Sequence, residues 1–226
     1  MGRVLMSRRT VFKTILGGLG VYGLTWRRPA LAAPELAVPA TLPVESLAFD
    51  KTGIDGWTTV EGQWAVEDMP GAPSGSKVLL PRATNNQFNV ILAPRGPYSD
   101  LDVSMKFKPI SGKEDASGGI VFRFSQGRYY VVRANALEDN VRLYFYDRGR
   151  RQIATSSVKA PTLAQWHTLR VVAVDDRMQA WLDGQPCLEH RDTRLKSGRV
   201  GLWTKADSIT AFDDLTVRGV KRGELP

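Results

Sequence analysis

The chain has 226 residues, one Cys, 42% hydrophobic residues and a net charge of +8 at pH 7. This composition excludes an intrinsically disordered protein, a disulfide-rich miniprotein and a Cys-rich zinc or iron–sulfur protein. The length suits one or two domains, and one large β domain fits equally well. Residues 1–32 hold six basic and no acidic residues, which leaves 25 Lys and Arg against 23 Asp and Glu, a net charge of +2. A domain so close to neutrality gives no electrostatic reason to expect a nucleic-acid partner.

The first 32 residues have the layout of an export signal. The stretch SRRTVFK at 7–13 resembles the twin-arginine (Tat) motif, an apolar Gly-rich run follows at 15–24, and Ala30-Leu31-Ala32 forms an A-x-A cleavage site. The apolar run is shorter than the about 20 residues that a membrane-spanning helix needs. We therefore predict a Tat-type signal peptide over 1–32, the Tat translocon as a transient partner, and release to the periplasm or the outside. An uncleaved membrane anchor or a basic amphipathic start is the alternative. After cleavage, which would leave Ala33 as the first residue, no stable membrane insertion is expected.

After the signal, the sequence predicts one large β domain. Residues 33–46, with three prolines, are expected to form an extended lead-in, residues 47–219 the domain, and residues 220–226 a tail. Alternating apolar and polar residues, with a period of two, predict strands. Such runs occur at 101–107, 120–124, 141–146, 169–173, 178–182, 200–202 and 209–217.

The connections between these runs are those of an antiparallel β protein. Asp183-Gly184 is a strong signal for a tight hairpin turn, and Asp175-Asp176 forms a short polar turn between two runs. Glu138-Asp139 is also expected to be a turn. No stretch longer than about ten residues has helical periodicity, and no repeat of 20–50 residues is present. These features predict an all-β fold, an antiparallel two-sheet sandwich.

The hairpin over residues 119–135 has two registers open to it. A two-residue Gln126-Gly127 turn pairs Arg123 with Tyr130, whereas a three-residue loop over 125–127 pairs Arg123 with Tyr129. The second register separates charge from the apolar face better, and a slip of one residue would bury charge at a high cost. We expect the second register. It places Ile120, Phe122, Tyr130, Val132 and Ala134 on one face and Val121, Arg123, Tyr129, Val131, Arg133 and Asn135 on the other.

Several longer stretches carry a family resemblance. They are GGIVFRFSQGRYYVVRANALEDNVRLYFYD, QWHTLRVVAV, WLDGQPC and GRVGLWTKADSITAFDDLTV, together with Gly56-Trp57 and GQWAV at 62–66. Over residues 49–218 the chain resembles the bacterial concanavalin A-like jelly-roll domains related to laminin G and to the 3-keto-disaccharide hydrolase family. The resemblance implies a jelly roll with one convex and one concave sheet. It leaves the function open, because such folds host hydrolases, lectin-like modules and interaction modules.

No recognisable catalytic signature is present. The E-x-D-x-x-E pattern of glucanases with this fold is absent, as are G-x-S-x-G, P-loop, H-E-x-x-H and G-x-G-x-x-G motifs. An enzyme acting on sugars would need a carboxylate or a metal near the same sheet face, and the available loop acids are Glu114, Asp115, Glu138 and Asp139. His167 and His190 are too few for a histidine-based metal site, and Cys187 is expected to be quiet and partly buried.

A structural calcium ion is a candidate cofactor. Many jelly-roll carbohydrate modules hold Ca²⁺ between the first and last strands, and this ion prefers carboxylate and carbonyl oxygens. Asp50 and Asp213 could supply such oxygens. The alternative is that both residues cap strand ends and turns.

One sheet face combines arginine and tyrosine in a way that suits sugars. Tyrosine rings offer flat apolar surfaces, and arginine forks donate hydrogen bonds to hydroxyls or acidic groups. The candidate ligand-binding residues are Arg123, Tyr129, Arg133, Asn135, Arg142, Tyr144 and Trp203, with Trp181 as an extension. A solvated face with stabilising Arg–Tyr stacking is the alternative. The sequence thus favours an exported protein that binds or processes a carbohydrate. A 3-keto-glycoside or disaccharide hydrolase-like enzyme and a non-enzymatic laminin-G-like interaction module are the two rivals.

Overall fold

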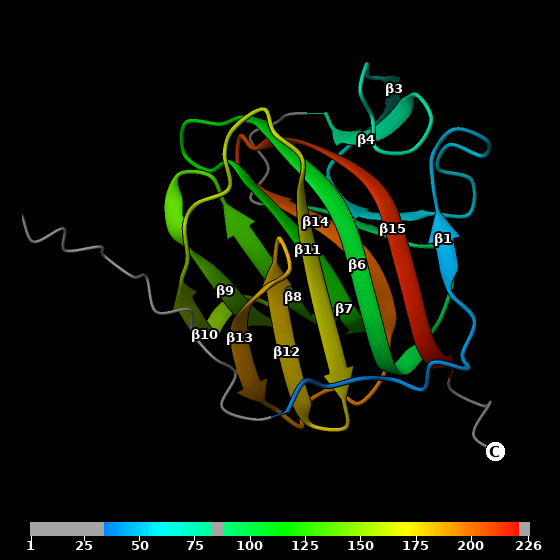
Figure 1. The fold of residues 1–226 in the computed structure, drawn as a ribbon, viewed down its shortest axis with the longest axis vertical. Helices are drawn as coiled ribbons and strands as arrows, with labels where there is room; N and C mark the ends of the chain where they lie inside the picture. The colour runs from blue at the N-terminus through cyan, green and yellow to red at the C-terminus, as the bar shows by residue number, and fades with distance from the viewer. Residues whose placement is uncertain (1–33, 83–87, 222–226) are drawn as a thin grey trace, which may run out of the picture.

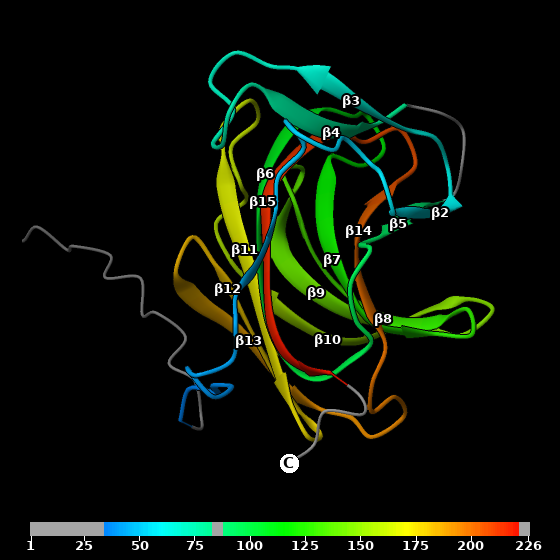
Figure 2. The same ribbon diagram turned by 90° about the vertical axis from the view of Figure 1, so that its right-hand side faces the viewer.

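The computed structural model describes residues 34–82 and 88–221, and the regular structure in these residues is entirely β-strand. The strands form two antiparallel sheets packed face to face, which confirms the predicted all-β sandwich (Figures 1 and 2). The predicted signal peptide lies outside the described residues. Within residues 34–82 and 88–221 there is no helix of the length and apolarity that a membrane crossing requires.

The eight-stranded sheet lies in front in Figure 1. Its order is β13 (Gln185–Arg191), β12 (Arg177–Leu182), β11 (His167–Val174), β6 (Tyr98–Ser111), β15 (Ile209–Lys221), β4 (Lys77–Pro81) and β3 (Trp64–Asp68), with β1 (Glu45–Leu47) also paired to β15. The seven-stranded sheet lies behind it. Its order is β10 (Arg150–Ser157), β9 (Glu138–Tyr146), β8 (Arg128–Asn135), β7 (Ser117–Ser125), β14 (Arg199–Lys205), β5 (Phe88–Leu92) and β2 (Thr58–Glu61).

The core lies between the two sheets and follows the predicted period of two. In β6, Leu101, Val103, Met105 and Phe107 are buried, while the residues between them are partly exposed. In the opposite sheet, Ile120, Phe122, Tyr130 and Val132 fill the same cluster. Each strand of the seven-stranded sheet therefore has an inner face in the core and an outer face directed away from the other sheet.

The β7–β8 hairpin uses both of the registers that the sequence left open. Along most of its length Phe122 pairs with Tyr130 and Ser117 with Asn135, as in the register we expected. At the tip, Ser125 pairs with Arg128 across a two-residue Gln126-Gly127 turn. The two registers are joined by a β-bulge at which Arg123 takes a φ of 52°. The bulge turns Arg123 out of the alternation, so its expected place on the outer face is wrong.

The lead-in segment packs against the outer face of the eight-stranded sheet. The amide of Leu36 donates to Gln179 Oε1 at 2.7 Å, and the Leu36 side chain is buried against Val172 and Trp181. Arg170 lies over the Trp181 ring, 4.6 Å from its centroid. Trp181 is thus on the opposite sheet from Trp203 and does not extend the Arg/Tyr surface as we expected.

Candidate functional site

The outer face of the seven-stranded sheet gathers six of the seven sequence-predicted ligand residues. The residues next to these six along the strands lie in the core, among them Val132, Val141, Leu143 and Leu202. Because side chains alternate along a strand, the six are directed away from the core. The six are Tyr129, Arg133, Asn135, Arg142, Tyr144 and Trp203. In Figure 2, the β2–β5 pair projects from the upper part of this side of the molecule, and the tip of the β7–β8 hairpin projects from its lower part.

Arg123 is the exception, because the bulge directs its side chain toward the other sheet. Its Nε donates to the carbonyl of Ser99 at 3.1 Å, and its Nη1 donates to the carbonyl of Leu195 at 3.0 Å. Asp100 faces the same guanidinium at 3.8 Å. Burial lowers the pKa of Arg123 below its usual value, and the charge of Asp100 opposes that shift. Arg123 therefore fastens the end of the sandwich and is not part of the outer face.

A packed aromatic row lies on the outer face. Tyr129 stacks on Tyr146 with centroids 4.8 Å apart, Tyr146 meets Phe88 edge-on at 5.9 Å, and Phe88 contacts Trp203 at 5.6 Å. Trp203 is 0% exposed, and Tyr129 and Tyr144 are each 3% exposed. These three rings leave almost no surface on which a sugar could stack, contrary to the expected role. They form a firm platform beneath the polar groups.

Arg150 covers part of this platform. Its guanidinium carbon lies 4.3 Å from the centroid of Tyr144, 5.5 Å from that of Phe88 and 5.9 Å from that of Trp203. Cation–π attraction of this kind contributes about 0.5–2 kcal/mol, with the larger values at desolvated sites. The guanidinium keeps donors for a ligand, because a ring face uses none of its N–H groups.

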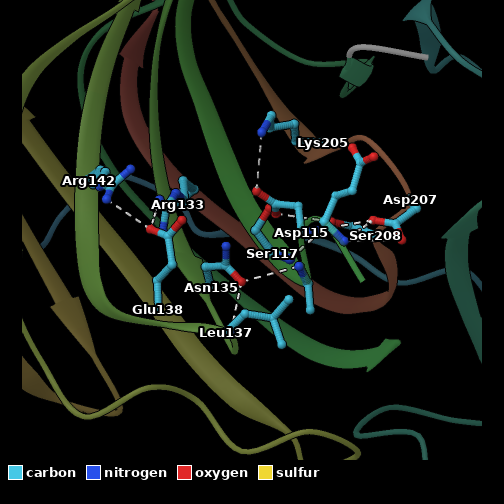
Figure 3. A network of polar contacts seen from close by, with 12 residues as sticks. Asp115, Ser117, Arg133, Asn135, Leu137, Glu138, Arg142, Lys205, Asp207 and Ser208 are labelled. Atoms are coloured by element: carbon cyan, nitrogen blue, oxygen red, sulfur yellow. Dashed lines mark hydrogen bonds and ion pairs between the residues drawn. The ribbon is translucent and has the colours of Figure 1, made fainter. Parts of the chain in front are cut away.

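A charged network, here called the polar ledge, occupies the β8–β9 end of the same face (Figure 3). It consists of Arg133, Glu138, Asn140 and Arg142. Glu138 Oε2 accepts hydrogen bonds from Arg133 Nη2 at 2.7 Å and from Asn140 Nδ2 at 3.0 Å, and it forms an ion pair with Arg142 Nη2 at 3.0 Å. Arg133 Nη1 also donates to Asn140 Oδ1 at 2.9 Å. Arg133 is buried, whereas the side chains of Arg142 and Glu138 are 31% and 36% exposed.

The ledge holds Glu138 in its ionised form. Burial is the largest single influence and by itself raises the pKa of Glu138. The hydrogen bonds from Arg133 and Asn140 and the charges of Arg133 and Arg142 outweigh it, so the net pKa lies below the usual value. Oε1 has no hydrogen-bond partner among the described residues and remains as an acceptor beside the Arg142 donors.

A second carboxylate, that of Asp115, lies on the same face next to the ledge (Figure 3). Asp115 is 3% exposed; its Oδ1 accepts from the Ser208 hydroxyl at 3.1 Å, and its Oδ2 lies 3.9 Å from Lys205 Nζ. The pKa of Arg142 is raised, chiefly by its hydrogen bond with Tyr144, and the charges of Glu138 and Asp115 add to this shift. Arg142 therefore lies in the field of two carboxylates.

Two residues hold these carboxylates in place. Asp207 accepts from three consecutive backbone amides, those of Lys113, Glu114 and Asp115, and the bond from Lys113 is the main reason that its pKa is lowered. The buried Asn135 Oδ1 accepts from the amides of Ala116 and Leu137, which links the Asp115 loop to the turn before Glu138. Asn135, one of the predicted ligand residues, is thus placed to position its neighbours.

The predicted calcium ligands lie together at another place. Asp50 Oδ1 accepts from the amide of Ser76 at 2.7 Å, and Asp213 accepts from the amide and the hydroxyl of Ser74, each at 2.8 Å. Both carboxylates are used to fasten one loop. Residues 34–82 and 88–221 contain no group of three or more His, Cys, Asp or Glu side chains arranged to hold a metal ion. The donors present fit a loop anchor better than a calcium site.

Sequence reasoning missed several outer-face residues. Glu138 was expected in a turn, but the turn is Ala136-Leu137, and Glu138 is the first residue of β9. Arg150, Lys205 and Phe88 gave no local signal of their own. Alternation from Arg142 backward along β9 would have placed Asn140 on the same face. Cys187 is more deeply buried than the partly buried position we expected, and its burial raises the pKa of its thiol to about 12, so it stays protonated.

Comparison with known proteins identifies the family. A family model described as the 3-keto-alpha-glucoside-1,2-lyase-like domain matches residues 45–218. The chain belongs to this family. The expected relationship to the 3-keto-disaccharide hydrolases is thereby confirmed. The matched range begins at β1 and ends within β15, so this lyase-like domain includes both sheets and the polar ledge.

The individual relatives of this lyase-like domain have low sequence identity to the chain. Levanase of Bacillus subtilis (strain 168) is 23% identical over 171 residues, which are 73% of this chain and 23% of levanase. The chain thus spans less than a quarter of that relative. The solved carbohydrate binding module CBM66 from Bacillus subtilis has a TM-score of 0.62 and 22% identity, covering 73% of this chain and 96% of the module. The Crh5 transglycosylase in complex with NAG has a TM-score of 0.60 and 12% identity, covering 79% and 84%. At these identities the structural matches establish the jelly-roll fold alone.

The pairing of Arg133 with Glu138 predicts a pH-dependent contribution to stability. Glu138→Gln should lower the free energy of unfolding at pH 7 by about 1–2 kcal/mol, less than for a fully buried pair because Glu138 is partly exposed. The folded-state pKa of Glu138 is depressed below 4.5, so its stabilisation is complete above that pH and is lost as the pH falls through the folded value. Urea denaturation should therefore show the difference between wild type and variant shrinking from pH 7 to pH 3.

Glu67→Gln is the matched control for this measurement. Glu67 pairs with Arg82 at 2.8 Å, but both side chains are well exposed, so its loss should change stability by less than about 0.5 kcal/mol. A Glu138→Gln difference that stays constant with pH would contradict the assigned ion pairing.

Proposed function

We propose that this domain binds a carbohydrate at the polar ledge on the outer face of the seven-stranded sheet. The observation that carries the proposal is the Glu138 carboxylate, which two guanidinium groups and an amide hold in place while Oε1 remains available. Arg142, 31% exposed, presents donors beside that acceptor. Neighbouring hydroxyls of a sugar each donate and accept a hydrogen bond, so a fixed carboxylate next to a fixed guanidinium matches them in pairs.

The surroundings of the ledge support the same proposal. Arg150 and the partly exposed Tyr146 extend the accessible surface, while Lys205 adds a cation beside Asp115. The buried aromatic row beneath keeps these groups rigid, which lowers the entropy that binding must overcome. The names of the relatives, a carbohydrate binding module and a levanase among them, agree with a saccharide ligand.

A second candidate function is an elimination reaction on a 3-keto-glucoside, the chemistry in the family description. A ketone at C3 acidifies the proton on C2. Asp115, buried and facing Lys205 at 3.9 Å, is placed to act as the base that removes this proton. The electron pair then forms the C1–C2 double bond as the C1–oxygen bond breaks, and the leaving alcohol takes a proton from water. Arg142 would stabilise the negative charge that develops on the C3 oxygen. Glu138 is less suited to be the base, because its pKa is lowered.

We also propose that the chain is exported by the Tat route and acts in the periplasm or outside the cell. The proposal rests on the order of the twin-arginine stretch, the apolar run and the A-x-A site in residues 1–32. The single cysteine of the chain is compatible with an oxidising compartment, since it leaves no thiol to mispair within the molecule.

Arg142→Gln should weaken saccharide binding without destabilising the domain. After an oligosaccharide panel identifies a ligand, calorimetric titration should show at least a tenfold higher Kd for the variant, about 1.4 kcal/mol, because one charged fork is lost. The melting temperature should change by less than about 2 °C. Arg151→Gln, an exposed arginine in β10, is the matched control and should bind like wild type. Unchanged affinity in Arg142→Gln would rule out the ledge as the site.

Asp115→Asn should abolish the elimination while keeping the fold. With 4-nitrophenyl 3-keto-α-glucoside as substrate, release of nitrophenol by the variant should fall at least about a hundredfold, the usual contribution of a general base. Asn can still accept from the Ser208 hydroxyl, so the melting temperature should be retained. Asp139→Asn, an exposed acid next to Glu138, should turn over like wild type. Absence of turnover by wild type would leave binding as the function, and full activity of Asp115→Asn would exclude Asp115 as the base.

Replacing Arg8 and Arg9 by Lys should block export. The full-length precursor should then accumulate in the cytoplasm, whereas N-terminal sequencing of the exported wild-type protein should begin at Ala33. The same double change at Arg27 and Arg28 leaves the motif intact and should not affect export. Equal export of both double variants would contradict the Tat assignment.

A further inference from the structure

A basic hollow lies at the end of the sandwich, apart from the polar ledge. Its volume is about 390 Å³, within the range of about 300–1,000 Å³ that is usual for small-molecule sites. Its walls come from the start of β6, the tip of the β7–β8 hairpin, the loop between β13 and β14 and the end of β15. The lining residues are Ser99, Ser125, Arg128, Arg194, Leu195, Lys196, Ser197 and Lys221. Four of the eight are cationic, three carry hydroxyls, and none is acidic.

The positive charge of this basic hollow is only partly neutralised. Asp192 binds Arg194 at 2.6 Å, and Glu45 binds Lys221 at 3.2 Å. Arg128 and Lys196 form no ion pair with any described residue. The nearby carboxylate of Asp100 is directed to Arg123 and also accepts from the amide of Asp175 at 3.0 Å. Two cationic side chains therefore face the hollow without a counter-charge.

The walls of the basic hollow are fixed before any ligand arrives. The buried guanidinium of Arg123 holds the carbonyls of Ser99 and Leu195, one on each side. The amide of Leu195 donates to the Tyr130 hydroxyl at 3.1 Å. Tyr98 and Gly198 exchange two backbone hydrogen bonds, each 3.0 Å long, which tie the β13–β14 loop to β6. The bulge at Arg123 thus makes the walls of the hollow rigid.

We propose that the basic hollow binds a tetrahedral oxyanion, namely the sulfate or phosphate group of a saccharide ester or the free ion. Arginine forks and lysine ammonium groups donate charge-assisted hydrogen bonds to such oxygens, and serine hydroxyls complete the set. The volume leaves room for the sugar that carries the group. Arg128 also lines the neighbouring surface hollow with Tyr146, whose ring stacks on the aromatic row of the outer face. A saccharide that runs from the outer face past the tip of the β7–β8 hairpin could therefore place an anionic group at its end in the basic hollow.

Calorimetric titration of the full chain tests this inference. Glucose 6-sulfate and glucose 6-phosphate should bind at least tenfold more tightly than glucose at the same ionic strength, set with sodium chloride. In the double variant Arg128→Gln/Lys196→Gln this advantage should fall at least tenfold. Arg151→Gln/Lys159→Gln removes the same charge from exposed positions elsewhere and should bind the esters like wild type. All four positions are at the surface, so melting curves should show that both variants fold.

Two further measurements are needed. One distinguishes a free anion from a sugar ester as the ligand, and the other distinguishes the basic hollow from the polar ledge as the binding site. If sodium sulfate or phosphate binds as tightly as the esters, the ligand is the free ion; if the esters bind more tightly, the sugar contributes. Arg142→Gln should keep the preference for the esters over glucose, whatever its effect on the affinity for the sugar itself, so a failure of the polar ledge and a failure of the basic hollow are distinguishable. Equal weakening in the two double variants, or no preference for the esters over glucose, would overturn the proposal.

Discussion

The arrangement of the outer face depends on one buried charge, the guanidinium of Arg133. Its side chain is 2% exposed, and an uncompensated charge at that depth would cost several kcal/mol. Glu138 and Asn140 supply the compensation, and both lie within seven residues of Arg133 across the β8–β9 turn. The need to neutralise Arg133 therefore fixes Glu138, and the fixed Glu138 in turn holds Arg142 at the rim of the face.

This dependence gives the two carboxylates of the face different chemical characters. Glu138 accepts hydrogen bonds from Arg133 and Asn140 on one oxygen and pairs with the charge of Arg142. It is therefore kept ionised, which suits a hydrogen-bond acceptor for hydroxyls. Asp115 is more buried but has one hydroxyl donor and one distant ammonium. Because Glu138 is held ionised by its donors, it is poorly suited to take up a proton, which leaves Asp115 as the candidate base. The same geometry can thus serve recognition through Glu138 and proton abstraction through Asp115.

The sequence predicted the two-sheet sandwich and which residues of a strand lie on the same face of its sheet. Both follow from the alternation of apolar and polar residues, which is a local property. The sequence placed six residues on one side correctly, namely Tyr129, Arg133, Asn135, Arg142, Tyr144 and Trp203. It did not predict how deeply the rings are buried, because burial depends on neighbours that are distant in sequence. Phe88 packs on Trp203, and Arg150 covers both rings, although each of these pairs is separated by 50 or more residues. Glu138 was misplaced because its turn is Ala136-Leu137, two residues before the Asp-containing segment that resembled a turn.

The misplacement of Arg123 has a physical cause that also explains its role. Neither of the two registers considered for the hairpin is used alone, because the strand pairing favours one and the Gln126-Gly127 turn favours the other. A single extra residue at Arg123 reconciles them, and a bulge necessarily changes the direction of the side chain that it contains. The charge that alternation would have placed beside Tyr129 is instead carried through to the opposite sheet, where it fastens the walls of the basic hollow. The conflict between strand register and turn geometry thus divides the arginines of one hairpin between two surfaces, with Arg133 supporting the polar ledge and Arg123 supporting the basic hollow.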